Sequence, residues 1–102
     1  MPRKVKLLMS WDVLPEQEAN TLEFMAHEMA PTIQQLGMTP TEAWYTVYGE
    51  GPQILVGAVA DDLAAVRHML ATDEWRALME KLTQFSRDFQ QKLVWAEGRF
   101  QL

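Results

Sequence analysis

The chain of 102 residues contains two histidines, His27 and His68. They are the residues best suited to act as a general base near neutral pH. An imidazole has a pKa close to neutrality, so it can accept and release a proton under ordinary conditions. His27 follows Glu23 by four residues and could serve as a base at a cleft. The alternative is a solvated histidine on a helix face with a modest contact to Glu23. The sequence favours this alternative, because nothing else around His27 indicates a functional site. It favours a solvated histidine more strongly still for His68, which lies beside Arg67.

Residue types exclude several other kinds of site. The chain has no cysteine, which rules out disulfides, thiolate nucleophiles and cysteine-ligated metals. A metal needs three or four converging ligands, and no His or Cys elsewhere in the sequence completes a set with Glu23 and His27. Gly49 and Gly51 resemble half of a dinucleotide fingerprint, but they precede a strand rather than a helix. We predict neither a metal nor a cofactor, although haem stays open in principle, since it needs only one histidine and a pocket.

Charge and hydropathy narrow the possible partners. The net charge is −5, and basic residues cluster only at Arg3, Lys4 and Lys6, whereas nucleic-acid binding relies on grouped Lys and Arg. The longest apolar run, Ile54–Ala60, is far shorter than the about 20 residues that span a bilayer, and the N-terminus has no signal-peptide core. With 48% hydrophobic residues, the chain can build one core over residues 1–102. We therefore expect a single-domain cytoplasmic protein that binds neither nucleic acid nor membranes.

These candidate residues must be positioned by strands and helices, which the first half of the chain predicts clearly. Residues 5–13 alternate in a way typical of a half-buried strand. Residues 16–36 change to helical spacing, with an apolar stripe made of Ala19, Leu22, Met25, Ala26, Met29, Ile33 and Leu36. Pro31 interrupts this helix, because an interior proline removes a hydrogen bond and clashes with the preceding turn. We expect a kink or a split near residues 29–31, and then a loop at residues 39–41.

The second half predicts two strands, a broken helix and a final strand. Aromatic and β-branched residues favour strands, glycines between two strands indicate a hairpin, and a threonine followed by acidic residues can start a new helix. The predicted elements are a strand at 43–48, a hairpin turn at 49–52, a strand at 53–60, a helix from 61 that breaks at 71–72 and resumes to 85, and a strand at 92–100.

This order, strand–helix–strand–strand–helix–strand, predicts an α+β fold of the ferredoxin-like type. Right-handed crossovers place both helices on one face of a four-stranded antiparallel sheet, and the other face stays open. By strand alternation we assign to the open face Leu8, Ser10, Asp12, Trp44, Thr46, Tyr48, Leu93, Trp95, Glu97 and Arg99, with the third strand adding either Leu55 and Val59 or Ile54 and Val56.

An open face with two tryptophans, a tyrosine and several aliphatic side chains is larger than the apolar patches that monomers normally expose. A two-fold homodimer with its two sheets face to face would cover it. The alternative is a monomer whose C-terminal residues fold back over the face, but only residues 100–102 remain for this. We therefore predict a homodimer.

The element order, the glycine-marked hairpin and the helix restart at Thr72-Asp73-Glu74-Trp75 together resemble the dimeric α+β barrel superfamily. Its members include antibiotic-biosynthesis monooxygenase-like, NIPSNAP-like and stress-responsive barrel-domain proteins. The resemblance covers nearly the whole chain and includes no catalytic motif. It implies a dimeric α/β barrel whose lumen or helix-side cleft can hold a small hydrophobic molecule. Activities in the superfamily span cofactor-free oxygenation, haem degradation, lactone isomerisation and polyketide cyclisation, so the fold does not select a chemistry.

The open face also supplies the predicted ligand site, since pockets for small organic molecules combine apolar and aromatic walls with a few polar groups. We assign ligand binding to Ser10, Asp12, Trp44, Thr46, Tyr48, Trp95 and Arg99, with His27, Tyr48 and Asp12 as catalytic candidates. The same residues could instead form the core of an interface. Two functions follow. The first is a homodimer that binds a small apolar or aromatic molecule, with or without cofactor-free chemistry, and the second is a non-enzymatic assembly module with no such site.

Overall fold

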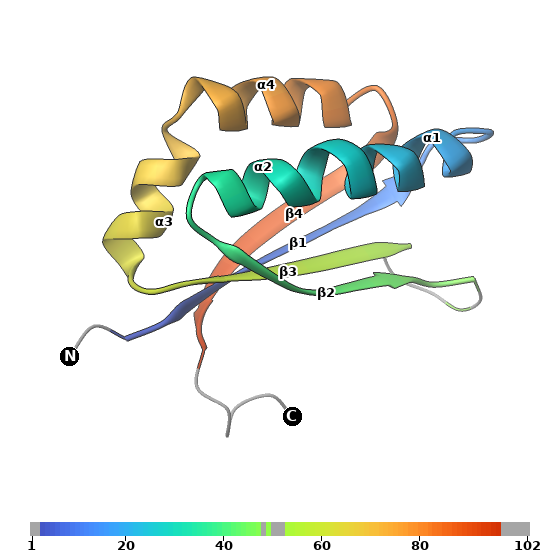
Figure 1. Cartoon of the computed structure of the whole chain (residues 1–102). Helices are drawn as coiled ribbons and strands as arrows, with labels where there is room; N and C mark the ends of the chain where they lie inside the picture. Colours follow the sequence, from blue (N-terminus) through green and yellow to red (C-terminus); the bar gives the residue numbers. More distant parts are fainter. Residues whose placement is uncertain (1–2, 48, 50–52, 97–102) are drawn as a thin grey trace.

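Strands and helices follow one another in the predicted order (Figure 1). The computed structural model describes residues 3–47, 49 and 53–96. The elements are β1 (Val5–Val13), α1 (Glu18–Phe24), the π-helix η1 (Met25–Met29), α2 (Ala30–Gln35), β2 (Thr39–Tyr45), β3 (Ile54–Ala60), α3 (Leu63–Leu70), α4 (Asp73–Leu82) and β4 (Ser86–Trp95). The consecutive helices α1, η1 and α2 are named here the first helical segment.

The four strands form one antiparallel sheet in the order β2-β3-β1-β4. The helices lie together on one face of this sheet, and none of the described helices covers the other face (Figure 1). This arrangement confirms the predicted ferredoxin-like α+β fold, in which the two crossovers bring the helices to the same side.

The central strand β1 divides its side chains between the two faces as its sequence predicts. Val5, Leu7, Met9, Trp11 and Val13 are buried toward the helices, and the residues between them are half-buried on the open face. Burying a large apolar side chain contributes roughly 1.5–3 kcal/mol, so this row anchors the core. The helices complete the core with Phe24, Met29, Ile33, Val66, Met69, Trp75, Leu78 and Leu82.

The disruption expected around Pro31 takes the form of a π-helix, η1, which separates α1 from α2. The first helical segment runs on without a gap, and in η1 the Ala30 amide donates to the carbonyl oxygen of Met25, five residues back. Pro31 then lies in the first turn of α2. Because proline has no amide proton and its ring crowds the carbonyl four residues earlier, a wider turn just before it relieves the conflict.

The predicted break in the second helical region is confirmed, and each of the two helices begins with a side-chain cap. The Thr72 hydroxyl oxygen accepts a hydrogen bond from the Trp75 amide at 3.1 Å at the start of α4. Asp62 caps α3 in the same way, accepting from the Ala65 amide at 2.8 Å. Both caps satisfy amides that helix geometry leaves without a partner.

Strand β2 begins earlier than expected. The loop predicted at residues 39–41 is wrong, because Thr39 and Pro40 pair with β3. Proline cannot donate a ladder hydrogen bond, but β2 is an edge strand and its register shifts between Pro40 and Glu42, so the proline is tolerated. The strand end predicted at Tyr48 and most of the hairpin turn lie outside the described residues.

Strand β4 also begins earlier than expected, at residue 86 rather than 92. Its first half is too polar to show apolar alternation, yet it pairs with β1 as the second edge strand. Leu93 lies opposite Leu7 and Trp95 lies opposite Val5, so both belong to the helix-covered face. The prediction that they lie on the open face is wrong. Alternation shows which residues of a strand share a face, but only the register shows which face that is.

Candidate functional site

The open face of the sheet is less apolar than the sequence predicted. Pairing with β1 places Leu55 and Val59 on this face, not Ile54 and Val56. The described residues on it include Lys6, Leu8, Ser10, Asp12, Thr39, Glu42, Trp44, Leu55, Gly57, Val59, Gln90, Lys92 and Val94. Polar side chains outnumber apolar ones among them. The open face therefore mixes polar and apolar side chains and is not mainly aromatic.

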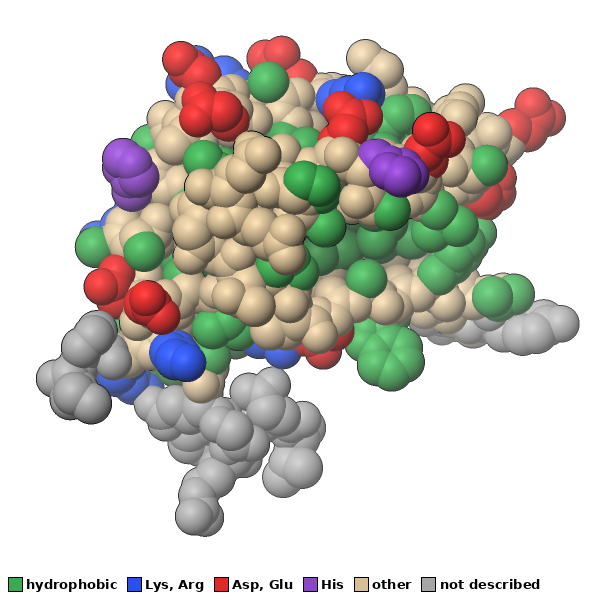
Figure 2. Space-filling model, viewed as in Figure 1, with side chains coloured by type: hydrophobic (Ala, Val, Ile, Leu, Met, Phe, Trp, Pro, Cys, Tyr) green, Lys and Arg blue, Asp and Glu red, His purple; other side chains and the backbone are tan. Residues whose placement is uncertain are grey.

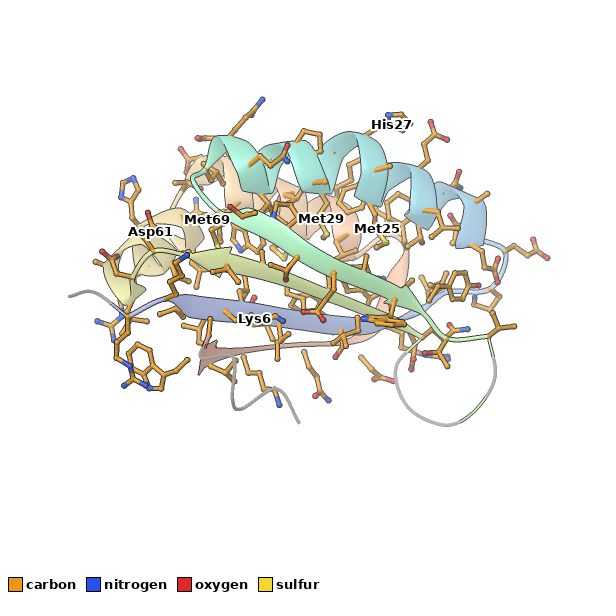
Figure 3. All side chains as sticks on the ribbon, turned by 60° about the horizontal axis from the view of Figure 1, so that its bottom comes forward. Lys6, Met25, His27, Met29, Asp61 and Met69 are labelled. Carbon is orange, nitrogen blue, oxygen red and sulfur yellow. The ribbon has the colours of Figure 1, made fainter. Side chains whose placement is uncertain are left out.

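An ion pair between Lys6 of β1 and Glu42 of β2 crosses β3 on the open face, and Lys6 lies on the side of the sheet away from the helices (Figure 3). The pair passes over Gly57, where a Cβ atom would lie 2.6 Å from Glu42 Oε1 and 2.9 Å from Lys6 Cε. Only a residue without a side chain leaves this room. The hydrogen bond from Lys6, helped by its charge, lowers the pKa of Glu42 against the opposing effect of partial burial.

Asp12 lies on the open face, and its contacts give it a structural role. Its carboxylate accepts a hydrogen bond from the Gln53 amide at 3.2 Å, and the Gln53 side-chain oxygen accepts one from the Val13 amide at 2.9 Å. These two bonds close the end of the β1–β3 pair. Its neighbour on this face, Ser10, lines a shallow hollow of about 340 Å³ together with Leu8, Met9, Leu55, Gln90, Gln91 and Lys92.

Two further predicted ligand residues, Trp44 and Thr46, lie near the end of β2 and are exposed. Trp44 is on the open face with 63% of its surface exposed. The Thr46 amide continues the strand pairing by donating to the Gln53 carbonyl oxygen at 2.7 Å. Tyr48, Glu97 and Arg99 lie outside the described residues. The described residues of the predicted aromatic cavity therefore form no closed pocket in a single chain.

Trp95 lies apart from the other predicted ligand residues, on the helix-covered face at the edge strand β4. Its ring centre is 4.0 Å from the guanidinium carbon of Arg3, a cation–π contact. Trp95, Leu93 and Phe89 are 44%, 38% and 37% exposed. Trp95 thus cannot share a cavity with Ser10 within one sheet.

His27 lies on the outer side of η1 and points away from the sheet (Figure 3). It borders a polar groove between the first helical segment and α4, which Glu28, Glu74 and Lys81 also line. The Glu28 carboxylate accepts a hydrogen bond from Lys81 Nζ there at 2.6 Å. In the described part of the chain, no three His, Asp or Glu side chains are placed to hold a metal ion. His27 is exposed at this position.

A more apolar hollow lies between the first helical segment and β2, on the helix side that the family resemblance implied as one of two ligand sites. Its volume is about 370 Å³, and hydrophobic side chains gather at it (Figure 2). This hollow is named here the helix–β2 groove. Its walls are Leu22, Met25, Ala26, Met29, Ala30 and Ile33 from the helical segment, and Pro40, Thr41, Glu42, Ala43 and Val56 from the sheet.

The groove exists because small residues face each other across it. Ala26 and Ala30 on the helical segment and Ala43 on β2 leave space that the longer side chains only partly fill. Met25 and Met29 reach from the helix toward the sheet beside this space (Figure 3). Sequence reasoning missed the groove, because an apolar helical stripe is taken as core by default. The signal that could have indicated it is Ala26, the single alanine of that stripe between Met25 and Met29.

Comparisons with protein-family models and with curated proteins found no match, but solved structures do match. An uncharacterised NIPSNAP-like domain protein from Burkholderia xenovorans has a TM-score of 0.72 at 18% identity, covering 96% of this chain and 89% of that one. A candidate antibiotic biosynthesis monooxygenase from Caulobacter crescentus has a TM-score of 0.76 at 14% identity, with 94% and 92% covered. A dimeric protein of unknown function and ferredoxin-like fold from Bacteroides fragilis has a TM-score of 0.64 at 16% identity, with 90% and 95% covered.

The chain has the fold that these proteins share. This finding confirms the resemblance inferred from the order of elements and from the helix restart at Thr72. Identities of this size establish the fold and leave the activity to be argued from the site. Among the described helices, none combines the length and the apolar character needed to cross a bilayer.

Proposed function

We propose that this protein is a homodimer that binds a small apolar molecule in the helix–β2 groove. The observation that carries the proposal is the groove itself, about 370 Å³ lined mainly by aliphatic and thioether side chains. Sites for small organic molecules usually measure about 300–1,000 Å³ and are mostly apolar, so the groove suits a ligand at the small end of that range. Met25 and Met29 are flexible and polarisable, which lets them adapt to the shape of a ligand.

Binding fits this groove better than catalysis. Among the described residues that line it, Glu42 is the only titratable one, and its carboxylate is engaged by Lys6 on the open face. A lowered pKa also makes Glu42 a weak general base near neutral pH. We therefore propose a binding protein in which any cofactor-free chemistry would depend on releasing Glu42 from Lys6.

The homodimer would form through the open faces of two sheets. Leu8, Leu55, Val59 and Val94 provide an apolar strip on this face, and two sheets packed face to face would bury it. Charged groups are costly to bury unless they are paired, and Lys6 and Glu42 already neutralise each other within one sheet. The dimeric Bacteroides fragilis protein with a ferredoxin-like fold supports this proposal.

The alternative function is an assembly module without a small-molecule site. The mixed open face favours it, because interfaces combine apolar centres with polar and charged surroundings. In that case the sheet surface is the functional site, and the helix–β2 groove is an unfilled surface depression. The two functions differ in whether the groove takes up a ligand.

The test is a titration of the full chain with N-phenyl-1-naphthylamine, a neutral fluorophore that brightens in apolar surroundings. Ala26→Phe would place a ring across the groove, and the exposed Ala64 on α3 offers a matched control, Ala64→Phe. We expect the native chain and Ala64→Phe to bind the dye, and Ala26→Phe to bind it about tenfold more weakly or worse. Equal binding by the two variants would refute the groove as the site.

Sedimentation velocity on the same samples separates the two functions. A species of twice the 11.8 kDa chain mass that binds the dye is the expected result. A dimer that binds no dye would favour the assembly module. A monomer at all concentrations tested would refute the dimer but not the groove, because the described residues that line the groove all belong to one chain.

We also propose that the protein works in the cytoplasm. A chain without cysteine gains no stability from an oxidising compartment, where secreted domains of this size often rely on disulfides. Fractionation of cells that express the chain checks this, and recovery only outside the cytoplasmic fraction would contradict it.

A further inference from the structure

The first helical segment buries a different set of side chains from the one that its sequence favours. In an unbroken α-helix, the apolar stripe would place Leu22 and Met25 on the same buried face as Met29. Met29 is buried, but Leu22 is 44% exposed, and Thr21 and Phe24 are buried in addition. The two halves of the segment are therefore out of phase with each other.

The π-helix η1 explains this difference in phase. The Ala30 amide bonds to the Met25 carbonyl oxygen, five residues back, so the turn holds one extra residue. An α-helix turns by about 100° per residue. One extra residue in the π turn therefore rotates the residues that precede it by one helix position relative to those that follow. Each residue before the turn therefore stands where its successor would stand in an unbroken α-helix. Thr21 occupies the place of Leu22, and Phe24 occupies the place of Met25.

Pro31 is the physical cause of the extra residue. In an unbroken α-helix its ring would clash with the carbonyl group of His27, four residues earlier, and it could offer that carbonyl no amide proton. An interior proline disfavours an α-helix by about two orders of magnitude in the equilibrium constant. A wider turn directly before Pro31 relieves the clash, and η1 ends two residues before it.

The resulting arrangement is unfavourable at two positions and favourable at a third. Thr21 Oγ1 is fully buried without a hydrogen-bond partner among the described residues, and Leu22 stays exposed. Phe24 compensates by packing against Phe85, with ring centres 5.5 Å apart. A local conflict that a fold retains is often found at a functional position. Here the conflict accompanies the placing of Leu22 and Met25 in the wall of the groove.

We propose that Pro31 is a positioning residue for the helix–β2 groove, because the π turn that it enforces keeps Leu22 and Met25 in the groove wall. This inference rests on the proposed ligand site and names the residue that shapes it. Without Pro31, the segment would form an unbroken α-helix in which Leu22 and Met25 move inward. The place of Leu22 at the groove would then pass to Glu23, and a carboxylate there disfavours an apolar ligand.

Pro31→Ala tests this role in the full chain, with N-phenyl-1-naphthylamine as the probe. We expect binding to weaken about tenfold and to recover when Glu23→Leu is added, because residue 23 then takes the place of Leu22. Glu23→Leu alone should leave binding unchanged, since Glu23 is exposed and does not line the groove. Pro15→Ala, at an exposed proline before α1, is the matched control. Unchanged binding by Pro31→Ala, or no recovery with Glu23→Leu, would overturn the proposal.

Thermal unfolding gives a second readout that does not depend on the dye. In the native chain, Thr21→Val replaces a buried hydroxyl without a partner and should raise the Tm by a few degrees. In the Pro31→Ala background, residue 21 turns outward, so the same change should leave the Tm unaltered. Equal shifts in the two backgrounds would overturn the change of register. A lowered Tm for Thr21→Val in the native chain would overturn it as well, however Pro31→Ala behaves.

The two readouts also separate this inference from the proposed function. If the native chain binds no dye, the ligand site fails, while the Thr21→Val comparison still decides the register. If the native chain binds the dye but the two Tm shifts are equal, the site stands and the positioning role of Pro31 fails.

Discussion

Gly57→Ala should destabilise this protein, although alanine is normally the better residue in a strand. Replacing glycine there usually gains about 0.5–1 kcal/mol, because glycine loses more backbone entropy on folding. Here the new methyl group would lie 2.6 Å from Glu42 Oε1, 2.9 Å from Lys6 Cε and 3.1 Å from Thr41 Oγ1. These atoms belong to flexible side chains, so the clash is relieved by breaking the ion pair rather than by moving the backbone.

The expected change in stability is the difference between the loss of the ion pair and the gain in backbone entropy. A hydrogen bond between charged groups contributes about 1.5–3 kcal/mol, and partial exposure of Lys6 and Glu42 places this pair at the lower end. Subtracting the gain for alanine leaves a net loss of about 1 kcal/mol, or roughly 4–8 °C in Tm for a domain of this size.

The assay is thermal unfolding, followed by circular dichroism, of the native chain, Gly57→Ala, Glu42→Ala and the double variant. Once Glu42 is alanine, the carboxylate no longer occupies the space above Gly57, so Gly57→Ala should be neutral or stabilising. We therefore expect the two changes to be non-additive by about 1–2 kcal/mol. A stabilising Gly57→Ala in the native chain, or strictly additive changes, would refute the idea that the ion pair fills this space.

Three further predictions concern charge, capping and assembly. Glu42 has a folded-state pKa below its ordinary value of 4.5, so its stabilising effect is present above that value and is lost as the pH falls through the folded-state pKa. As the pH falls through this range, the unfolding free energy of Glu42→Gln should thus decrease less steeply than that of the native chain. Equal slopes for the two proteins would count against the ion pair. Thr72→Ala should cost about 1 kcal/mol in urea unfolding through the lost cap of α4, and a cost no larger than that of the exposed Thr46→Ala would contradict the capping role. Leu55→Asp should dissociate the proposed dimer in sedimentation velocity while Trp95→Ala should not, and the opposite result would contradict the assignment of faces.

The parts of the fold that could be predicted from the sequence have their causes within a few residues of chain. The alternation of β1 follows from its own side chains, and the helix break follows from the capping ability of Thr72. Other elements depend on partners distant in sequence. Pro40 fits a strand only because β2 is an edge, and the polar first half of β4 is a strand only because β1 offers it a pairing partner.

The candidate site was harder to predict for the same physical reason. Trp95 is assigned to a face by its register against Val5, which alternation within β4 does not contain. The groove depends on Ala26 and Ala43 meeting across two elements. The apolar stripe also runs evenly past Pro31, so nothing in its spacing indicates the extra residue held in η1.

The most direct test of the ligand site is methyl NMR of methionine-labelled protein during titration with N-phenyl-1-naphthylamine. Met25 and Met29 line the groove, whereas Met69 is a buried residue of α3 and lies away from the groove (Figure 3). We expect the methyl resonances of Met25 and Met29 to shift and to saturate with the dye, while that of Met69 stays in place. Saturating dye binding that leaves the Met25 and Met29 resonances unmoved would contradict a ligand site in the helix–β2 groove.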